Sequence, residues 1–137
     1  MPMRRRGPRS AQLRRRRADE RFERLVERAI DAIPGPFREA LAEVAIVIED
    51  DATTNQLEIA GLPTDDVLYG LYEGTPRTSW GADLVPFPNK ISLFRRPLES
   101  DFRDPDELAD EVRRTIVHEL AHHLGIDDDR LDELGLA

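Results

Sequence analysis

The chain has 137 residues, enough for one domain with a single hydrophobic core but too few for a separate substrate-binding domain. It contains no cysteine, which excludes a disulfide framework, a thiolate nucleophile and a cysteine-based metal site. The formal net charge of −8 is unevenly distributed, because residues 1–28 contain eleven arginines and four acids, whereas the rest of the chain is strongly acidic.

Long apolar segments are missing from the sequence. No run approaches the roughly 18 apolar residues of a membrane span, and the N-terminus lacks the apolar middle region of a secretory signal. These features predict a cytoplasmic protein without a membrane partner.

The N-terminal segment is rich in arginine and almost free of apolar residues. Residues 1–17 hold eight arginines, two prolines and one glycine, so they cannot form a core. We expect residues 1–18 to be a disordered arm and residues 19–137 to form the folded domain. Clustered arginines attract phosphate backbones, which makes nucleic acid a possible partner of the arm; a simple solvated leader is the other interpretation, and no aromatic residue interleaves the arginines.

The folded part begins with an amphipathic helix. From Asp19 onward, apolar residues recur at spacings of three and four until the Pro34-Gly35-Pro36 sequence ends the pattern: Phe22, Leu25, Val26, Ala29, Ile30 and Ile33. This spacing predicts a helix that packs one face on a sheet. A short helical turn is expected over 37–43.

Three short runs predict strands. Residues 44–49 are apolar and β-branched, residues 67–72 are rich in aromatic side chains, and residues 91–95 follow a proline-rich stretch. Between them, 50–66 reads as a loop with at most a short strand at 57–60, and 77–89 as an irregular segment. Arg95 and Arg96 are expected to cap an exposed edge.

The strongest helix signal covers 105–124. Asp104 is a natural cap ahead of Pro105, and one apolar stripe follows: Ala109, Ile116, Val117, Leu120, Ala121 and Leu124. His118 and His122 fall away from this stripe, which is unlike core histidines. A last short helix is expected over 130–136.

All three histidines of the chain lie between residues 118 and 123. Residues four apart stand on the same helix face, so His118 and His122 can bind one ion, while Glu119 can reach a water on that ion without ligating it. A catalytic zinc site needs a third protein ligand. Gly125 can adopt the left-handed conformation that ends a helix and turns the next residues back toward the histidines.

The full pattern H-E-x-x-H-x-x-G-x-x-D resembles the zincin metallopeptidases, in a metzincin-like form with aspartate where most members have a third histidine. Residues 68–76, 90–98 and 111–119 are similar to a family of small bacterial proteins with a minimal zincin-like fold, described as possible zinc metallopeptidases. The similarity extends from about residue 20 to the end of the chain.

The resemblance implies a compact α+β fold, with a mixed sheet of three or four strands packed on the N-terminal helix and on the active-site helix. It also implies Zn²⁺ held by His118, His122 and Asp128, with Glu119 as general base. His123 is expected near the site but outside the ligand set, and Asp127 or Asp129 as a partner of a ligand histidine or a solvated acid.

The implied activity is hydrolysis of a peptide bond in a peptide or protein substrate by a metal-activated water. The alternative is a zinc-binding module with little catalytic activity that acts as an interaction protein, with the basic arm contacting partners or nucleic acid. Tyr69, Tyr72, His123 or a nearby arginine are candidates to stabilise the oxyanion. An edge strand within 69–72 or 91–95 is expected to bind the extended substrate.

Overall fold

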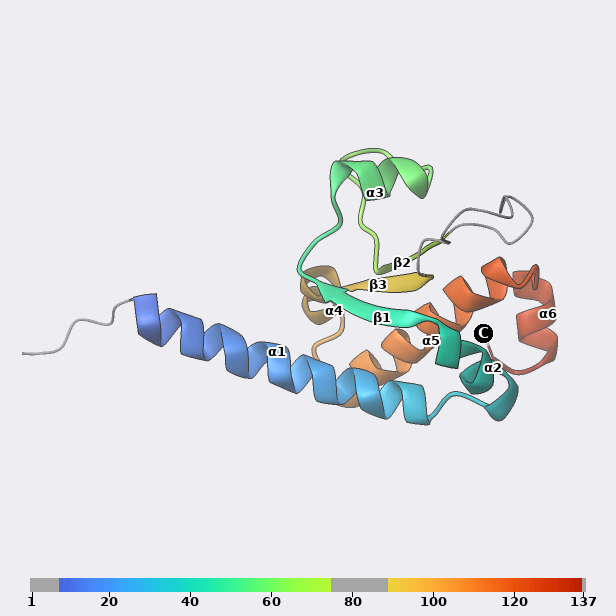
Figure 1. Ribbon diagram of the computed structural model, residues 1–137, viewed down its shortest axis with the longest axis horizontal. Helices are drawn as coiled ribbons and strands as arrows, with labels where there is room; N and C mark the ends of the chain where they lie inside the picture. Colours follow the sequence, from blue (N-terminus) through green and yellow to red (C-terminus); the bar gives the residue numbers. More distant parts are fainter. Residues whose placement is uncertain (1–7, 75–88, 137) are drawn as a thin grey trace, which may run out of the picture.

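A computed structural model describes residues 8–74 and 89–136 of the chain, and the side chains of its first helix from residue 17 onward (Figure 1). The elements, in chain order, are α1 (Pro8–Asp31), α2 (Gly35–Ala40), a 3-10 turn η1 (Leu41–Glu43), β1 (Ala45–Glu49), α3 (Thr54–Ile59), β2 (Gly70–Glu73), β3 (Lys90–Phe94), α4 (Arg95–Asp101), α5 (Pro105–His123) and α6 (Asp128–Glu133). The expected irregular segment 77–89 lies outside the described residues, apart from Asn89.

Helix α1 is longer than its apolar pattern predicts. It begins at Pro8 and not at Asp19, so residues 8–18 are helical where a disordered arm was expected. The expected stripe is confirmed, because Phe22, Val26, Ala29 and Ile33 are buried in the core. The N-terminal part of α1 extends beyond the sheet and α5 (Figure 1). The division into an arm and a domain stays a prediction.

The sheet is mixed and has three strands in the order β1-β3-β2. Strand β3 lies in the middle, parallel to β1 and antiparallel to β2. Ile91 and Leu93 of β3 face the main core, which α1 and α5 complete on one side of the sheet. The expected compact α+β fold is confirmed, and β1 and β2 are the two edge strands, with no further strand paired to either among the described residues.

Helix α3 covers the opposite face of the sheet, where a loop was expected. Its N-terminus has a capping box, in which the Thr53 side chain accepts a hydrogen bond from the Gln56 N–H and the Gln56 side chain accepts one from the Thr53 N–H. The Gln56 amide also donates to Glu49 of β1 and Glu73 of β2, both at 3.0 Å. The short strand expected at 57–60 is therefore wrong.

Helix α5 follows its sequence signals closely. Asp104 caps it by accepting hydrogen bonds from the N–H groups of Asp106 and Glu107, both at 3.1 Å. The stripe from Ala109 to Ala121 is buried, but Leu124 is 51% exposed because the helix ends beside it. No helix in the described part of the chain has the length and apolarity needed to cross a membrane.

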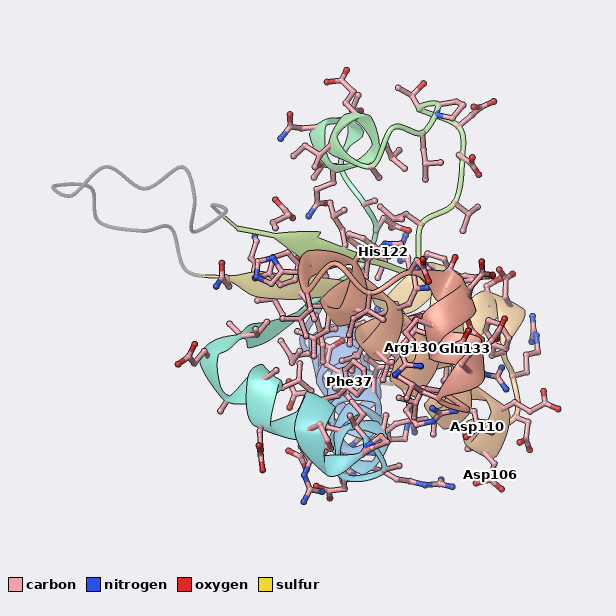
Figure 2. All side chains as sticks on the ribbon, turned by 90° about the vertical axis from the view of Figure 1, so that its right-hand side faces the viewer. Phe37, Asp106, Asp110, His122, Arg130 and Glu133 are labelled. Carbon is pink, nitrogen blue, oxygen red and sulfur yellow. The ribbon has the colours of Figure 1, made fainter. Side chains whose placement is uncertain are left out.

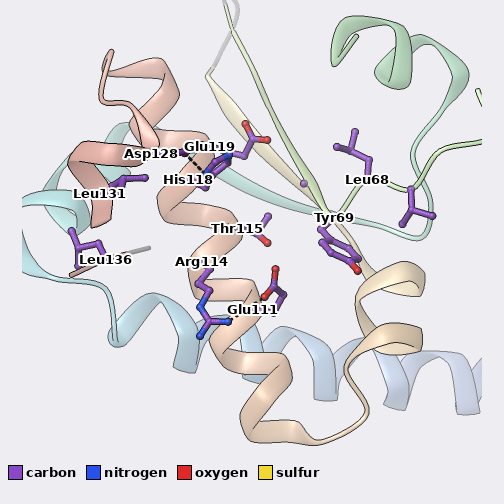
Figure 3. A pocket seen from close by; sticks show the side chains of 12 residues that line it. Leu68, Tyr69, Glu111, Arg114, Thr115, His118, Glu119, Asp128, Leu131 and Leu136 are labelled. Carbon is purple, nitrogen blue, oxygen red and sulfur yellow. Dashed lines mark ion pairs between the residues drawn. The ribbon is translucent and has the colours of Figure 1, made fainter. Parts of the chain in front are cut away.

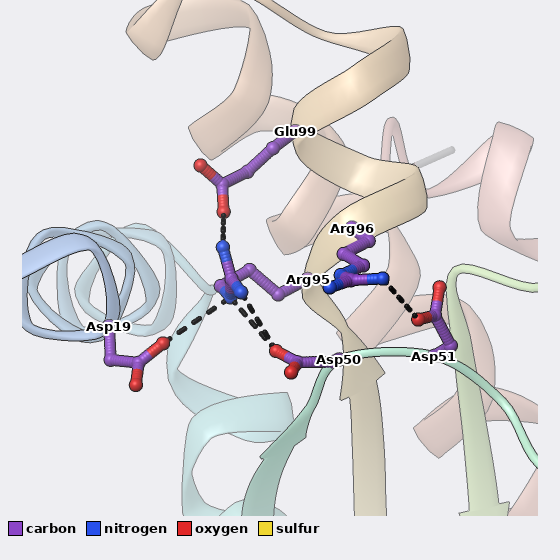
Figure 4. Close-up of polar contacts among 6 residues, drawn as sticks. All are labelled: Asp19, Asp50, Asp51, Arg95, Arg96 and Glu99. Atoms are coloured by element: carbon purple, nitrogen blue, oxygen red, sulfur yellow. Dashed lines mark hydrogen bonds and ion pairs between the residues drawn. The ribbon is translucent and has the colours of Figure 1, made fainter. Parts of the chain in front are cut away.

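Arg95 joins three parts of the fold at the start of α4, a helix that the sequence analysis did not predict. Its guanidinium pairs with Asp50 after β1 at 2.8 Å, with Glu99 of α4 at 2.8 Å and with Asp19 of α1 at 3.4 Å (Figure 4). Its side chain is only 14% exposed. The expectation that Arg95 caps an exposed edge is wrong, because β3 is the central strand and has no free edge.

Replacing Arg95 by alanine should lower the free energy of unfolding by about 2 kcal/mol, because three acids lose their shared charged partner. The matched control is Arg96→Ala. Arg96 is 64% exposed and makes one pair with Asp51, at 3.5 Å, so its loss should cost less than about 0.5 kcal/mol. Urea unfolding of both variants measures the difference, and equal losses would contradict the role of Arg95.

Candidate metal centre

The last two turns of α5 present His118 and His122 on one face. Their ring centroids are 4.1 Å apart and the rings are tilted by 59°. Their side chains are about half exposed, at 45% and 52%, whereas the stripe on the other face is buried. Two neighbouring imidazoles on an accessible face of a helix are arranged for a shared ligand and not for core packing.

The turn after α5 brings the chain back to these histidines. Gly125 has a φ of 76°, in the left-handed region that glycine tolerates. The Ile126 N–H donates to the Ala121 carbonyl at 2.8 Å and the Gly125 N–H to the His122 carbonyl at 3.2 Å, which is the Schellman ending of a helix. The turn that the sequence predicts at Gly125 is thus confirmed.

Helix α6 starts immediately after this turn, at Asp128 and not at residue 130 as expected. Asp127 caps it, because its carboxylate accepts a hydrogen bond from the Arg130 N–H at 2.9 Å. Figure 2 shows α6 beside α5, with Arg130 and Glu133 on the part of α6 that lies away from His122. The cap leaves Asp128 as the first helical residue, on the side of the histidines.

Asp128 completes a three-residue cluster with the two histidines, and Figure 3 shows its pairing with His118. Its Oδ1 atom lies 3.1 Å from Nδ1 of His118 and 3.7 Å from Nε2 of His122. One ligand atom from each of the three residues can be chosen within 4.8 Å of the others. Four-coordinate zinc with bonds of about 2.0–2.1 Å places its ligand atoms about 3.4 Å apart.

The donor set fits zinc in chemistry as well as in spacing. Two imidazoles and one carboxylate are the ligands of many catalytic zinc sites, and three protein ligands leave a fourth position for water or substrate. Among the residues that the structure describes, this is the one group of histidines and acids that meets the spacing of a metal site. Which atoms bind a metal stays a prediction.

Glu119 lies next to this cluster without belonging to it. Burial raises the pKa of its carboxyl group, while a hydrogen bond from the Tyr72 main chain and the charges of His118 and His122 act in the opposite direction. A carboxylate with a raised pKa is a stronger base near neutral pH than an ordinary glutamate. Its position suits the predicted role of proton acceptor, which stays a prediction.

A cavity of about 470 Å³ opens in front of the cluster. Residues 67–70, which lead into β2, form one wall, and side chains of α5 and α6 form the other: Glu111, Thr115, His118, Glu119, Asp128 and Leu131 (Figure 3). The cavity is long enough to extend past the histidines toward Glu111, two turns earlier on α5. It therefore offers room for a ligand larger than a metal ion.

Gly70 allows β2 to approach α5 at this cavity. A Cβ atom at this position would lie 2.6 Å from Cγ2 of Thr115 and 3.1 Å from the carbonyl oxygen of Ser92, so a side chain would push the strand away from the helix. The sequence analysis did not identify Gly70 or Thr115 as site residues. A glycine between two tyrosines in a strand was the available signal, since such a glycine often marks a close approach.

The candidate oxyanion stabilisers differ in their surroundings. The Tyr69 hydroxyl donates a hydrogen bond to Asp101, and this bond, with burial, raises the pKa of Tyr69 to about 12. The hydroxyl proton of Tyr69 is therefore donated to Asp101 and does not point to the histidines. The ring of His123 stacks on Tyr72 with centroids 4.2 Å apart, so His123 lies near the site but outside the three-residue cluster.

A mixed sheet above a helix whose C-terminal turns carry two histidines, with a returning aspartate, defines a zincin-like fold. A family model described as zincin-like metallopeptidase matches residues 41–136, from the start of η1 to three residues beyond the end of α6. This match covers more than half of the chain, so the protein belongs to the zincin-like metallopeptidase family. No curated protein matches the chain significantly. Helices α1 and α2 both precede the matched region.

Replacing Gly125 by alanine should destabilise the protein by about 1–2 kcal/mol, because a Cβ atom disfavours the left-handed conformation. The same change should weaken zinc binding, since it disturbs the turn that positions Asp128. Gly125→Asn is the control, because asparagine tolerates this conformation and should retain most of both properties. Thermal unfolding and zinc titration of the two variants are the measurements. Unchanged stability and zinc binding in Gly125→Ala would show that the turn does not require glycine.

Proposed function

We propose that the protein is a zinc-dependent peptidase in which His118, His122 and Asp128 hold the metal and Glu119 is the general base. The observation that supports this proposal best is the convergence of the three ligand atoms beside Glu119 in an open cavity. The family of the chain favours the same activity.

The protein's own groups fit the steps of peptide hydrolysis. A bound zinc ion would supply a Lewis acid that lowers the pKa of water and polarises the scissile carbonyl. Glu119 accepts the proton of the attacking water as the new C–O bond forms. It then returns this proton to the nitrogen as the C–N bond breaks, so that no proton is gained or lost overall.

The edge of β2 is the proposed binding place for the substrate backbone. Strand β2 is outermost in the sheet, and the segment leading into it forms one wall of the cavity. An extended peptide that adds to this edge would lie alongside β2, in the cavity in front of Glu119. Of the two segments considered from the sequence, 91–95 is excluded because β3 has a partner on both sides.

Purified protein should bind one equivalent of zinc and cleave peptides from a mixed library, and a chelator should abolish the cleavage. Glu119→Ala should keep the zinc and lower kcat by about 10²–10⁴-fold, as expected for loss of a general base. Metal analysis and mass spectrometry of the digested library provide the readouts.

The adjacent histidines supply a matched control for the ligand assignment. His122→Gln should lose the zinc, whereas His123→Gln should retain it, because His123 stacks on Tyr72 outside the cluster. Retention of a full equivalent by His122→Gln would refute the ligand assignment. Full zinc occupancy with no cleavage of any peptide would instead favour the alternative function, a zinc-binding interaction module.

The basic helix suggests a second partner besides a peptide substrate. Helix α1 extends beyond the body (Figure 1), and eight arginines lie in residues 1–17, outside the region that matches the family. We propose that this segment contacts nucleic acid through phosphate groups.

Binding to duplex DNA or RNA should then weaken steeply with salt, as release of counterions requires. A variant that lacks residues 1–17 should lose this binding while keeping its zinc content and its unfolding midpoint. A fluorescence anisotropy titration at several salt concentrations measures the effect. Equal binding by the shortened variant would contradict the proposal.

A further inference from the structure

The free edge of β2 presents main-chain groups that the sheet itself does not use. The Phe94 N–H donates to the Tyr69 carbonyl at 2.9 Å, and Leu71 lies opposite Ser92 in the antiparallel register. Hydrogen-bonded pairs alternate along such a ladder, so Leu71 faces β3 with its N–H while the N–H of Tyr72 points to the open edge. This N–H is therefore a donor that an added strand would use.

The donor at Tyr72 is already engaged in the free protein. The carboxylate of Glu119 accepts a hydrogen bond from the Tyr72 main chain. Stacking of the Tyr72 ring on His123, with centroids 4.2 Å apart, holds this residue against the C-terminal turns of α5 from a second side. Tyr72 thus contacts α5 at two residues. Its ring stacks on His123, and its main chain bonds to Glu119, the residue after the candidate ligand His118.

The hydrogen bond to Tyr72 offsets the free-energy cost of burying the Glu119 carboxylate. Glu119 is half-buried, and a half-buried carboxylate without a donor loses much of its hydration. A main-chain N–H at the edge of a sheet needs an acceptor for the same reason. Each group therefore satisfies the other as long as no ligand occupies the cavity.

An extended peptide and Glu119 compete for the same proton donor. A strand that adds to β2 needs the Tyr72 N–H for one of its own carbonyl groups, and an N–H has one hydrogen to donate. Pairing of the peptide with β2 must then break the bond to Glu119, or Glu119 must prevent that pairing.

We infer that Glu119 is tethered to the Tyr72 N–H in the free protein and that an extended peptide releases it by pairing with β2. The base becomes free only when a peptide backbone lies along the edge strand. Tyr72 is a positioning residue in this scheme, and it acts through its main chain. The inference rests on the proposed function, because it assigns the released carboxylate the role of base.

Amide hydrogen exchange in the metal-free protein tests the tether without any measurement of turnover. Glu119→Ala should speed exchange of the Tyr72 amide by about tenfold or more, since the loss of a hydrogen bond to a charged group opens the site. The Leu71 amide, which faces β3, should change less than about twofold and is the internal control. Glu119→Gln keeps a hydrogen-bond acceptor, so its Tyr72 exchange rate should lie between those of the wild type and Glu119→Ala.

Equal Tyr72 exchange rates in the wild type and Glu119→Ala would overturn the tether and leave the peptidase proposal intact. A clear difference together with zinc-loaded protein that cleaves no peptide would keep the tether and reject the proposed function. The two proposals therefore fail separately. Unchanged Leu71 exchange and an unchanged amide spectrum elsewhere show that the variant has the native fold.

The release step has its own test in metal-free protein. The probe is a hexapeptide of alternating alanine and valine, capped at both ends, and binding is followed by the amide shifts of Gly70 and Tyr72. Removal of the competing carboxylate in Glu119→Ala should tighten binding by about fivefold or more, the change expected when one competing hydrogen bond is lost. Equal affinities, including no binding by either protein, would overturn release by strand pairing.

Discussion

The structure depends on α5, because one face of this helix packs in the core and the opposite face carries the candidate metal ligands. Its buried stripe closes the core against α1 and the sheet, while the opposite side of the same turns carries His118 and His122. A period of 3.6 residues per turn makes this division possible, since residues four apart share a face and their neighbours do not. Packing of the core therefore fixes the position of the histidine face relative to β2.

The side chains at this face gain their properties from elements far away in the sequence. Burial under β2 raises the pKa of Glu119, and the turn at Gly125 brings Asp128 within 3.1 Å of His118. Gly70 lets β2 approach α5 closely enough to form the wall of the cavity. The candidate chemistry thus arises from contacts among β2, α5 and α6.

Local signals account for the elements that the sequence predicted well. Helix α5 has a cap, a proline at its first position and a long apolar stripe, and β1 is a continuous β-branched run. The errors have physical causes as well. Helix α3 is six residues long and has no apolar period, so the capping box at Thr53 is the local signal that indicates it. The helical conformation of residues 8–18 continues α1 without any apolar stripe to indicate it.

The sequence by itself determined which side chains stand together on α5 and where the helix must end, because helical spacing and the conformation of glycine are local properties. It could not decide that β3 is central and β2 is the edge, since strand order depends on pairing between distant segments. Only the tertiary structure therefore places a main-chain donor of β2 against Glu119 and shows how closely Asp128, which the motif indicates, approaches the histidines.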